Sequence, residues 1–104
     1  MLVVDNFTAT HLYRIAGEAV QNAVRHARAK DIEVSLSEDK QGLLLKIRDD
    51  GAGFSAPPPG GAAQLGMQIM RYRAGLIGAI LTIQSAPKRG TVVSCRLPRK
   101  DDAP

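Results

Sequence analysis

Two small groups of residues have types and spacings that could do chemistry. Glu18 and Asn22 are four positions apart, so on a helix they would be neighbours and offer a carboxylate and a neutral oxygen to a cation. Asp49 closes an apolar run and is followed by Gly51 and Gly53, which would let a ligand approach the backbone closely. An Asp-Gly pair also occurs in ordinary turns, so the second group alone does not separate a turn from a binding edge.

Hydrophobic periodicity predicts the elements that must position these residues. Apolar residues at helical spacing predict a first helix over residues 10–29, capped by Thr8 or Thr10, and a second helix over residues 66–77 that ends at Gly78. Alternating or dense apolar runs predict strands at residues 32–36, 43–49, 80–84 and 91–97. This pattern favours the α+β class, as a two-layer sandwich with a mixed, mostly antiparallel sheet covered on one face by helices.

A chain of 104 residues predicts one domain with a modest core. We interpret residues 1–7 as a remnant lead segment and expect residues 99–104 to fray as a charged tail. Residues 54–65 contain three consecutive prolines and could link two domains or form a loop within one. Each half would be too small to build a good core, so a loop that closes over a ligand is favoured.

Charge and composition limit the classes of partner that this chain could bind. The formal net charge is +4, which would suit nucleic acid, but basic residues are scattered and not interleaved with aromatic ones. We therefore predict no nucleic-acid partner. No apolar run approaches the roughly 18 residues of a membrane span, so no direct membrane contact is expected from this segment. The single Cys95 excludes an internal disulfide, favours a reducing compartment, and lies in a strand pattern that indicates a buried structural thiol and not a reactive one.

Four segments, taken in order, resemble the boxes of the Bergerat-type (GHKL) ATPases. Residues 18–27 resemble the N box of the histidine-kinase branch, and residues 49–54 resemble the first glycine box. Residues 65–74 are similar to the second glycine box in its nitrate/nitrite-sensor form, and residues 85–91 are similar to the closing Gly-Thr turn. The resemblance covers about residues 8–98 and implies the Bergerat fold, with residues 54–65 as the ATP lid.

The resemblance also implies roles for the polar residues of the first two boxes. Asn22 would be the Mg²⁺ ligand, and Glu18 would be the catalytic base or hold a metal-bound water. Asp49 would accept a hydrogen bond from the exocyclic amine of adenine and so select adenine over guanine, with Gly51 and Gly53 packed close to the base.

Five further residues complete the predicted ATP site. Arg25 could reach phosphate, and the resemblance places His26 in or beside the nucleotide pocket; a phosphoacceptor role for His26 is disfavoured. Gly66 and Met67 would open the second helix, whose free N–H groups attract phosphate. Thr91 either contacts nucleotide or simply starts a strand. One departure is that Gln64 stands where many relatives carry the first glycine of the second box, which bears on the phosphate-loop geometry.

The resemblance implies the ATP-binding catalytic domain of a bacterial sensor histidine kinase, with ATP and Mg²⁺ as cofactors. Its partners would be the phosphoacceptor His domain of the same kinase, absent from this segment, and a downstream response regulator. The domain would be cytoplasmic even if its parent is membrane-anchored, and alone it would bind ATP without phosphorylating itself. Two alternatives remain open: an anti-sigma-type serine kinase, and a degenerate interaction module that no longer binds ATP, which Gln64 would favour.

Overall fold

The computed structural model describes residues 4–53 and 61–99, and these contain two helices and four strands. In chain order the elements are α1 (Asn6–Arg25), β1 (Ile32–Asp39), β2 (Gly42–Asp49), α2 (Ala62–Leu76), β3 (Ile80–Ser85) and β4 (Thr91–Leu97). All six predicted elements are therefore present, although several begin or end at other residues than predicted. Parts of three predicted segments lie outside the described residues, namely 1–3 of the lead at 1–7, 54–60 of the lid at 54–65, and 100–104 of the tail at 99–104.

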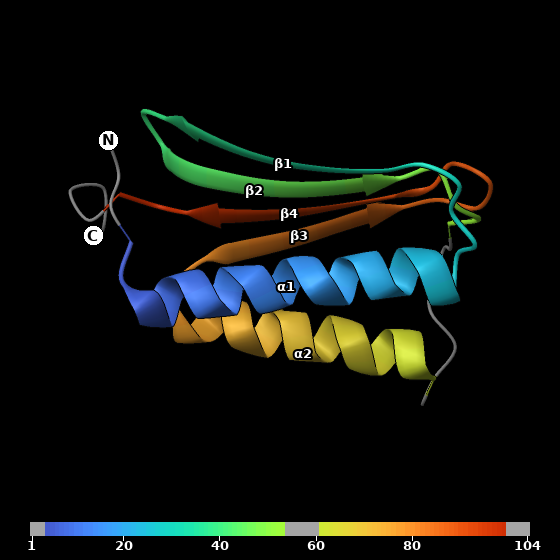
Figure 1. The fold of residues 1–104 in the computed structure, drawn as a ribbon, viewed down its shortest axis with the longest axis horizontal. Coiled ribbons are helices and arrows are strands. Elements are labelled where there is room, and N and C mark those ends of the chain that lie inside the picture. The colour runs from blue at the N-terminus through green and yellow to red at the C-terminus, as the bar shows by residue number, and fades with distance from the viewer. Residues whose placement is uncertain (1–3, 54–60, 100–104) are drawn as a thin grey trace.

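The four strands form one sheet in the order β1-β2-β4-β3, and both helices lie against the same face of it (Figure 1). The predicted α+β, two-layer class is confirmed. Each neighbouring pair is antiparallel, so the expectation of a mixed sheet was wrong for the described strands. The reason is the position of β4, which separates β2 from β3 and runs opposite to both, so that these two parallel segments never pair.

Helix α1 begins and ends earlier than predicted. Asp5 caps it, since a carboxylate oxygen of Asp5 accepts a hydrogen bond from the Thr8 N–H at 2.8 Å. Phe7 therefore belongs to the helix and not to a lead segment. At the other end the helix stops at Arg25 and not at residue 29, because Arg28 adopts a positive φ of 52° that a right-handed helix cannot continue through.

The core lies between the helix pair and the inner face of the two central strands, β2 and β4. Side chains alternate between the faces of a strand, so alternate residues of these strands meet the helices. The buried apolar cluster consists of Leu12, Ile15, Ala19, Leu45, Ile47, Met70, Ala74, Val93 and Cys95. Cys95 is 1% exposed, which confirms the predicted burial, and burial raises the pKa of its thiol to about 11, as is typical of a structural cysteine.

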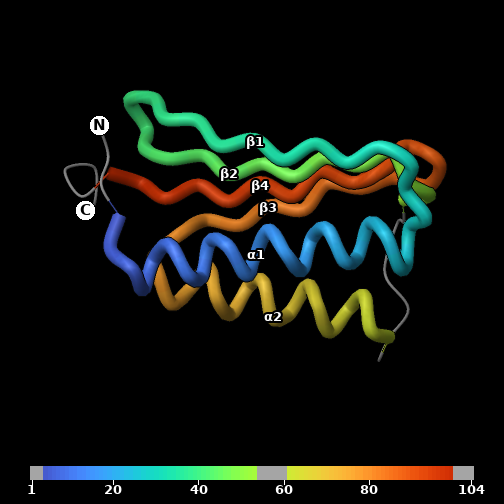
Figure 2. The backbone as a smooth tube through the Cα atoms, in the orientation of Figure 1, coloured from blue at the N-terminus to red at the C-terminus, as the bar shows by residue number. Residues whose placement is uncertain are grey.

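The smooth backbone trace shows α1 and α2 running side by side beneath the sheet for most of its length (Figure 2). The glycine turn that follows β2 and the turn at residues 86–90 that precedes β4 lie at one end of this sandwich, where Asp49 pairs with Thr91. Neither helix in the described part of the chain is both long and apolar enough to cross a bilayer.

Candidate functional site

Two adjoining cavities lie at that end of the sandwich. The larger, of about 330 Å³, is lined by six of the predicted site residues, together with small and apolar side chains: Asn22, His26, Asp49, Gly53, Met67 and Thr91. The smaller, of about 190 Å³, shares two of them and adds three more, its predicted members being Glu18, Asn22, Arg25, His26 and Gly66. The structure thus brings every predicted site residue except Gly51 into the lining of one continuous region.

Asp49 ends β2 with one carboxylate oxygen committed and one available. Its Oδ1 accepts a hydrogen bond from the Gly51 N–H at 2.8 Å, which fixes the orientation of the carboxylate. No other hydrogen bond from the described residues engages this group, so Oδ2 is available to a ligand in the cavity. Gly51 therefore does not line the cavity, but its N–H orients the Asp49 carboxylate.

Thr91 is the nearest neighbour of Asp49 across the sheet. The two are register partners on β2 and β4, so their side chains leave the same face. Thr91 is only 8% exposed, and its hydroxyl lies 2.8 Å from the Ser85 hydroxyl. Thr91 was predicted as either a nucleotide contact or a plain strand start; its place in the cavity lining supports the first interpretation.

Glu18 and Asn22 lie side by side on α1, facing α2. The Oε2 atom of Glu18 is buried and has no hydrogen-bond partner among the described residues, which is costly for a carboxylate unless a ligand or cation satisfies it. A Cβ added to Gly66 would lie 3.1 Å from Asn22 Oδ1 and 3.4 Å from Glu18 Oε2, so Gly66 lets α2 pass close to both groups. An unsatisfied carboxylate beside an amide oxygen fits the oxygen ligands that Mg²⁺ prefers.

The described residues hold no cluster of three or more His, Cys, Asp or Glu side chains. A divalent cation here would thus depend on ligand phosphates as well as on protein oxygens, which is how Mg²⁺ is commonly held.

The prediction that Gly66 and Met67 open α2 was wrong. The helix begins at Ala62 after Gly61, so Gly66 is its fifth residue and its N–H lies within the helical turn. Residues 62–65, which were predicted as the end of the lid, are therefore helical, and Ala, Gln and Leu are good helix formers. The first two residues of the helix are Ala62 and Ala63, and both line the larger cavity.

Arg25 and His26 stand at the end of α1, where the chain turns away. Arg25 is exposed and borders only the smaller cavity, whereas His26 borders both. His26 is also the C-cap of α1, and its N–H donates to the Asn22 carbonyl at 3.0 Å. His11 lies fifteen positions earlier on α1 and contacts Arg73, 3.1 Å away, so it is not part of this site.

Asp50, given no firm role by the sequence, ties the glycine loop to the chain that follows α1. Its Oδ1 accepts hydrogen bonds from the N–H groups of Lys30 at 2.8 Å and Asp31 at 2.9 Å. The Ala52 N–H donates to the Ala27 carbonyl, and the Lys88 N–H donates to the Ala52 carbonyl. Three loops are thereby fastened together beside the cavity.

Acidification should loosen this junction. The N–H groups of Asp31 and Lys30 hold the pKa of Asp50 below its ordinary value of 3.8. A carboxylate whose pKa is lower in the folded than in the unfolded chain stabilises the fold above the unfolded pKa, and this stability is lost as pH falls through the folded pKa. We expect Asp50→Asn, which still accepts both bonds but does not titrate, to lose less stability between pH 7 and pH 3 than the wild type.

The measurement is the urea midpoint of both chains at the two pH values. Equal midpoints at pH 7 would show that the asparagine preserves the junction. An identical drop in the two chains at pH 3 would contradict the assignment of this acid sensitivity to Asp50.

Fold and site together define a class, namely two-layer α+β domains of the Bergerat type with a ligand cavity between the helices and one end of the sheet. The chain belongs to the family described as histidine kinase-, DNA gyrase B-, and HSP90-like ATPase, whose model matches residues 8–101. The resemblance drawn from the four boxes is therefore confirmed at the level of the family.

Individual relatives are sensor proteins, one of them named as a histidine kinase. The chain is 33% identical over 97 residues to the oxygen sensor histidine kinase NreB of Staphylococcus carnosus, covering 93% of this chain and 28% of that protein. It is 38% identical over 94 residues to the sensor protein VraS of Staphylococcus haemolyticus, covering 88% of this chain and 27% of that protein. The chain thus spans little more than a quarter of the length of these curated relatives.

Solved structures share the fold. The histidine kinase domain of the Erythrobacter litoralis blue-light activated histidine kinase aligns with a TM-score of 0.75 at 24% identity, covering 94% of this chain and 50% of that one. The ATP binding domain of PrrB from Mycobacterium tuberculosis aligns with a TM-score of 0.68 at 26% identity, covering 86% of this chain and 67% of that one. The described residues therefore share the fold of these two domains.

Proposed function

We propose that this chain is the ATP-binding catalytic domain of a sensor histidine kinase, which presents the γ-phosphate of Mg-ATP to a histidine on a separate domain. The observation that carries the proposal is Asp49, with one carboxylate oxygen fixed by Gly51 and the other available to the larger cavity. Membership in the ATPase family and similarity to named sensor histidine kinases support the same conclusion.

At the adenine end, Asp49 would accept a hydrogen bond from the 6-amino group, a position at which guanine has a carbonyl that cannot donate. Gly53 would lie close to the base, and Thr91 would contact it from the neighbouring strand. Met67 lines the same cavity and would contribute apolar contact to the ring. Gly51 would act through the orientation of Asp49.

At the phosphate end, Asn22 would hold Mg²⁺ by its amide oxygen, and Glu18 would orient a metal-bound water or act as the base. When bound, the metal would neutralise negative charge on the phosphates. Arg25 and His26 border the same space and would contact phosphate from the end of α1. Gly66 would serve by allowing α2 to approach Asn22.

The phosphoacceptor domain would approach along α2. Leu65, Tyr72 and Leu76 are exposed on this helix at positions i, i+7 and i+11, so they share one face, and Leu65 also borders the smaller cavity. An exposed apolar stripe beside the phosphate end suits a protein partner that must reach the γ-phosphate.

A response regulator would then receive the phosphoryl group from that partner. The reaction would take place in the cytoplasm.

The degenerate-module alternative is disfavoured by the buried Glu18 Oε2, because a carboxylate oxygen with no partner among the described residues is costly in a chain that binds nothing. The serine-kinase alternative shares this fold and is separated from the histidine kinase only by the residue that becomes phosphorylated.

We expect the isolated chain to bind nucleotide without labelling itself. His11 contacts Arg73 away from the cavities, and His26 caps α1 as part of their wall, so neither is placed as an acceptor. The test is incubation with γ-labelled ATP, alone and together with the helical phosphoacceptor domain of a sensor kinase. Acid-labile label on that domain only is the expected result. Acid-labile label on His11 or His26 would contradict the proposal, and acid-stable label on a supplied protein serine would favour the serine kinase.

A further inference from the structure

Three polar residues form one row across the inner face of the sheet. Asp49 on β2 is the register partner of Thr91 on β4, and Thr91 is the register partner of Ser85 on β3. Side chains of directly paired residues leave the same face, so the row lies on the side covered by the helices. Asp49 and Thr91 line the larger cavity, whereas Ser85 stands behind Thr91 and does not.

The hydroxyl groups of this row have a defined hydrogen-bond direction. Ser85 Oγ lies 3.1 Å from the Gly90 carbonyl oxygen and 2.8 Å from Thr91 Oγ1. A carbonyl can only accept, so the single hydroxyl hydrogen of Ser85 points to Gly90. Both contacts are hydrogen bonds only if the hydrogen between the two hydroxyls comes from Thr91. The opposite assignment would leave two acceptor oxygens facing each other at 3.1 Å.

This direction fixes what Thr91 presents to the cavity. Its only hydrogen is donated to Ser85, so the Thr91 oxygen can offer lone pairs alone. Asp49 offers a carboxylate oxygen beside it. Two acceptors side by side suit a ligand edge that carries hydrogen-bond donors, such as an exocyclic amino group with its two N–H bonds. They disfavour a ring that carries an oxo group at the same position.

We propose that Ser85 is a positioning residue that holds the Thr91 hydroxyl as an acceptor and thereby contributes to the selection of a 6-amino purine over a 6-oxo purine. The inference rests on the proposed nucleotide-binding function. Without Ser85 the Thr91 hydroxyl can rotate and donate to a 6-oxo group, so discrimination falls while the pocket keeps its shape. A carboxylate at Asp49 alone then carries the selection.

The test compares the affinities of Mg-ADP and Mg-IDP by calorimetric titration, because hypoxanthine replaces the amino group of adenine by an oxo group. The wild type should favour ADP, and Ser85→Ala should lower the ratio of the two affinities by about 3- to 10-fold, the range expected for one hydrogen bond that changes from mismatched to matched. Ser85→Thr, which keeps the hydroxyl, should restore the ratio.

Thr91→Val supplies the second arm of the test. Because Ser85 acts through Thr91, adding Ser85→Ala to Thr91→Val should leave the ratio of affinities unchanged. If Ser85→Ala does not fold, Ser85→Cys takes its place, since a thiol keeps the volume but is a weak hydrogen-bonding group.

The outcomes separate the two levels of the proposal. A wild-type chain that binds neither nucleotide overturns the proposed function and this inference with it. A wild type that prefers ADP, together with a Ser85→Ala chain that keeps the same ratio or loses both affinities equally, overturns the positioning role and leaves the proposed function intact.

Discussion

Asp49→Asn should weaken binding of Mg-ADP by about 100-fold or more. An asparagine side chain has one oxygen. That oxygen is needed to accept the hydrogen bond that the Gly51 N–H donates to Asp49 in the wild type. The new NH₂ group must then face the cavity, where it would meet the amino group of adenine as donor against donor. Loss of a hydrogen bond to a charged group and the creation of an unpaired donor together cost about 3 kcal/mol, which corresponds to this factor.

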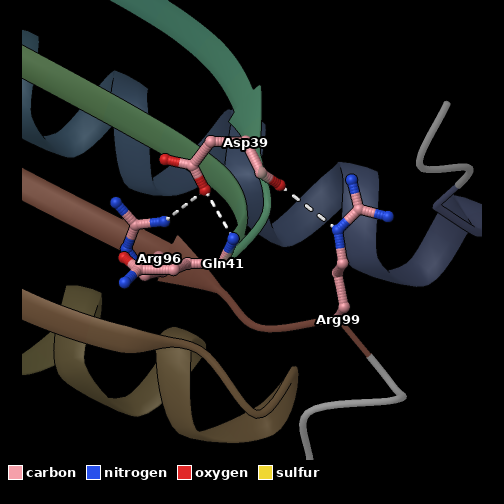
Figure 3. Close-up of polar contacts among 4 residues, drawn as sticks. All are labelled: Asp39, Gln41, Arg96 and Arg99. Atoms are coloured by element: carbon pink, nitrogen blue, oxygen red, sulfur yellow. Dashed lines mark hydrogen bonds and ion pairs between the residues drawn. The ribbon is translucent and has the colours of Figure 1, made fainter.

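Asp39→Asn is the matched control for that substitution. Asp39 Oδ1 accepts the Gln41 N–H at 2.7 Å in the same local arrangement, and it also accepts from Arg96 at 3.1 Å (Figure 3). Asp39 pairs with Gly42 at the turn of the β1–β2 hairpin, the end away from Asp49. Calorimetry should show unchanged ADP affinity for Asp39→Asn. Wild-type affinity in a folded Asp49→Asn chain would remove Asp49 from the proposed adenine site.

Gly53→Ala should destabilise the fold by more than about 3 kcal/mol and abolish binding with it. Gly53 has a φ of 66°, which by itself costs an alanine about 1–2 kcal/mol. An added Cβ would also overlap the Ala86 carbonyl oxygen and lie 3.0 Å from the Gly90 carbonyl oxygen. Both contacts are with backbone, so the glycine loop and the turn before β4 would have to separate.

Gly78→Ala distinguishes the clash from the backbone strain. Gly78 has a nearly identical φ of 69°, but an added Cβ would find nothing within 4 Å. Its cost should therefore stay near the 1–2 kcal/mol of the conformation alone. Urea unfolding of both variants measures the difference, and equal losses would show that the packing of Gly53 against the turn does not stabilise the junction.

Periodicity placed every element of the fold, but local chemistry set the ends differently. The first helix was expected to start at residue 10 because two threonines could cap it, whereas Asp5 does so earlier. Strand β1 continues to Asp39, past its last apolar residue, because pairing with β2 supplies its backbone partners. The residues at which an element begins and ends depend on the neighbouring strand or on competing capping residues. A hydrophobic pattern carries no information about either.

Gly66 illustrates why part of the site escaped prediction. A glycine before an apolar run indicates a helix start, but the same residue also serves where two helices approach closely. Gly66 has the second role, because it lies against Asn22 and Glu18 where the two helices approach. This contact forms only when α1 and α2 pack together.

Ser85 and Asp50 likewise make their hydrogen bonds only in the folded chain, Asp50 with Lys30 and Asp31, and Ser85 with Gly90 and Thr91. The one available signal for Ser85 was a hydroxyl at an inward position of a strand, after Leu81 and Ile83. By contrast, Asp49 and Asn22 could be named as candidates from the sequence, because their residue types and spacing suit the proposed chemistry directly.

Titration of the wild-type chain with ADP, in the presence and absence of Mg²⁺, tests the central claim most directly. The arrangement of Asp49, Thr91 and Asn22 predicts saturable binding at one site in the micromolar range, tighter with the metal present. Absence of binding by a chain that unfolds cooperatively in urea would contradict the claim and favour an interaction module that has lost its nucleotide.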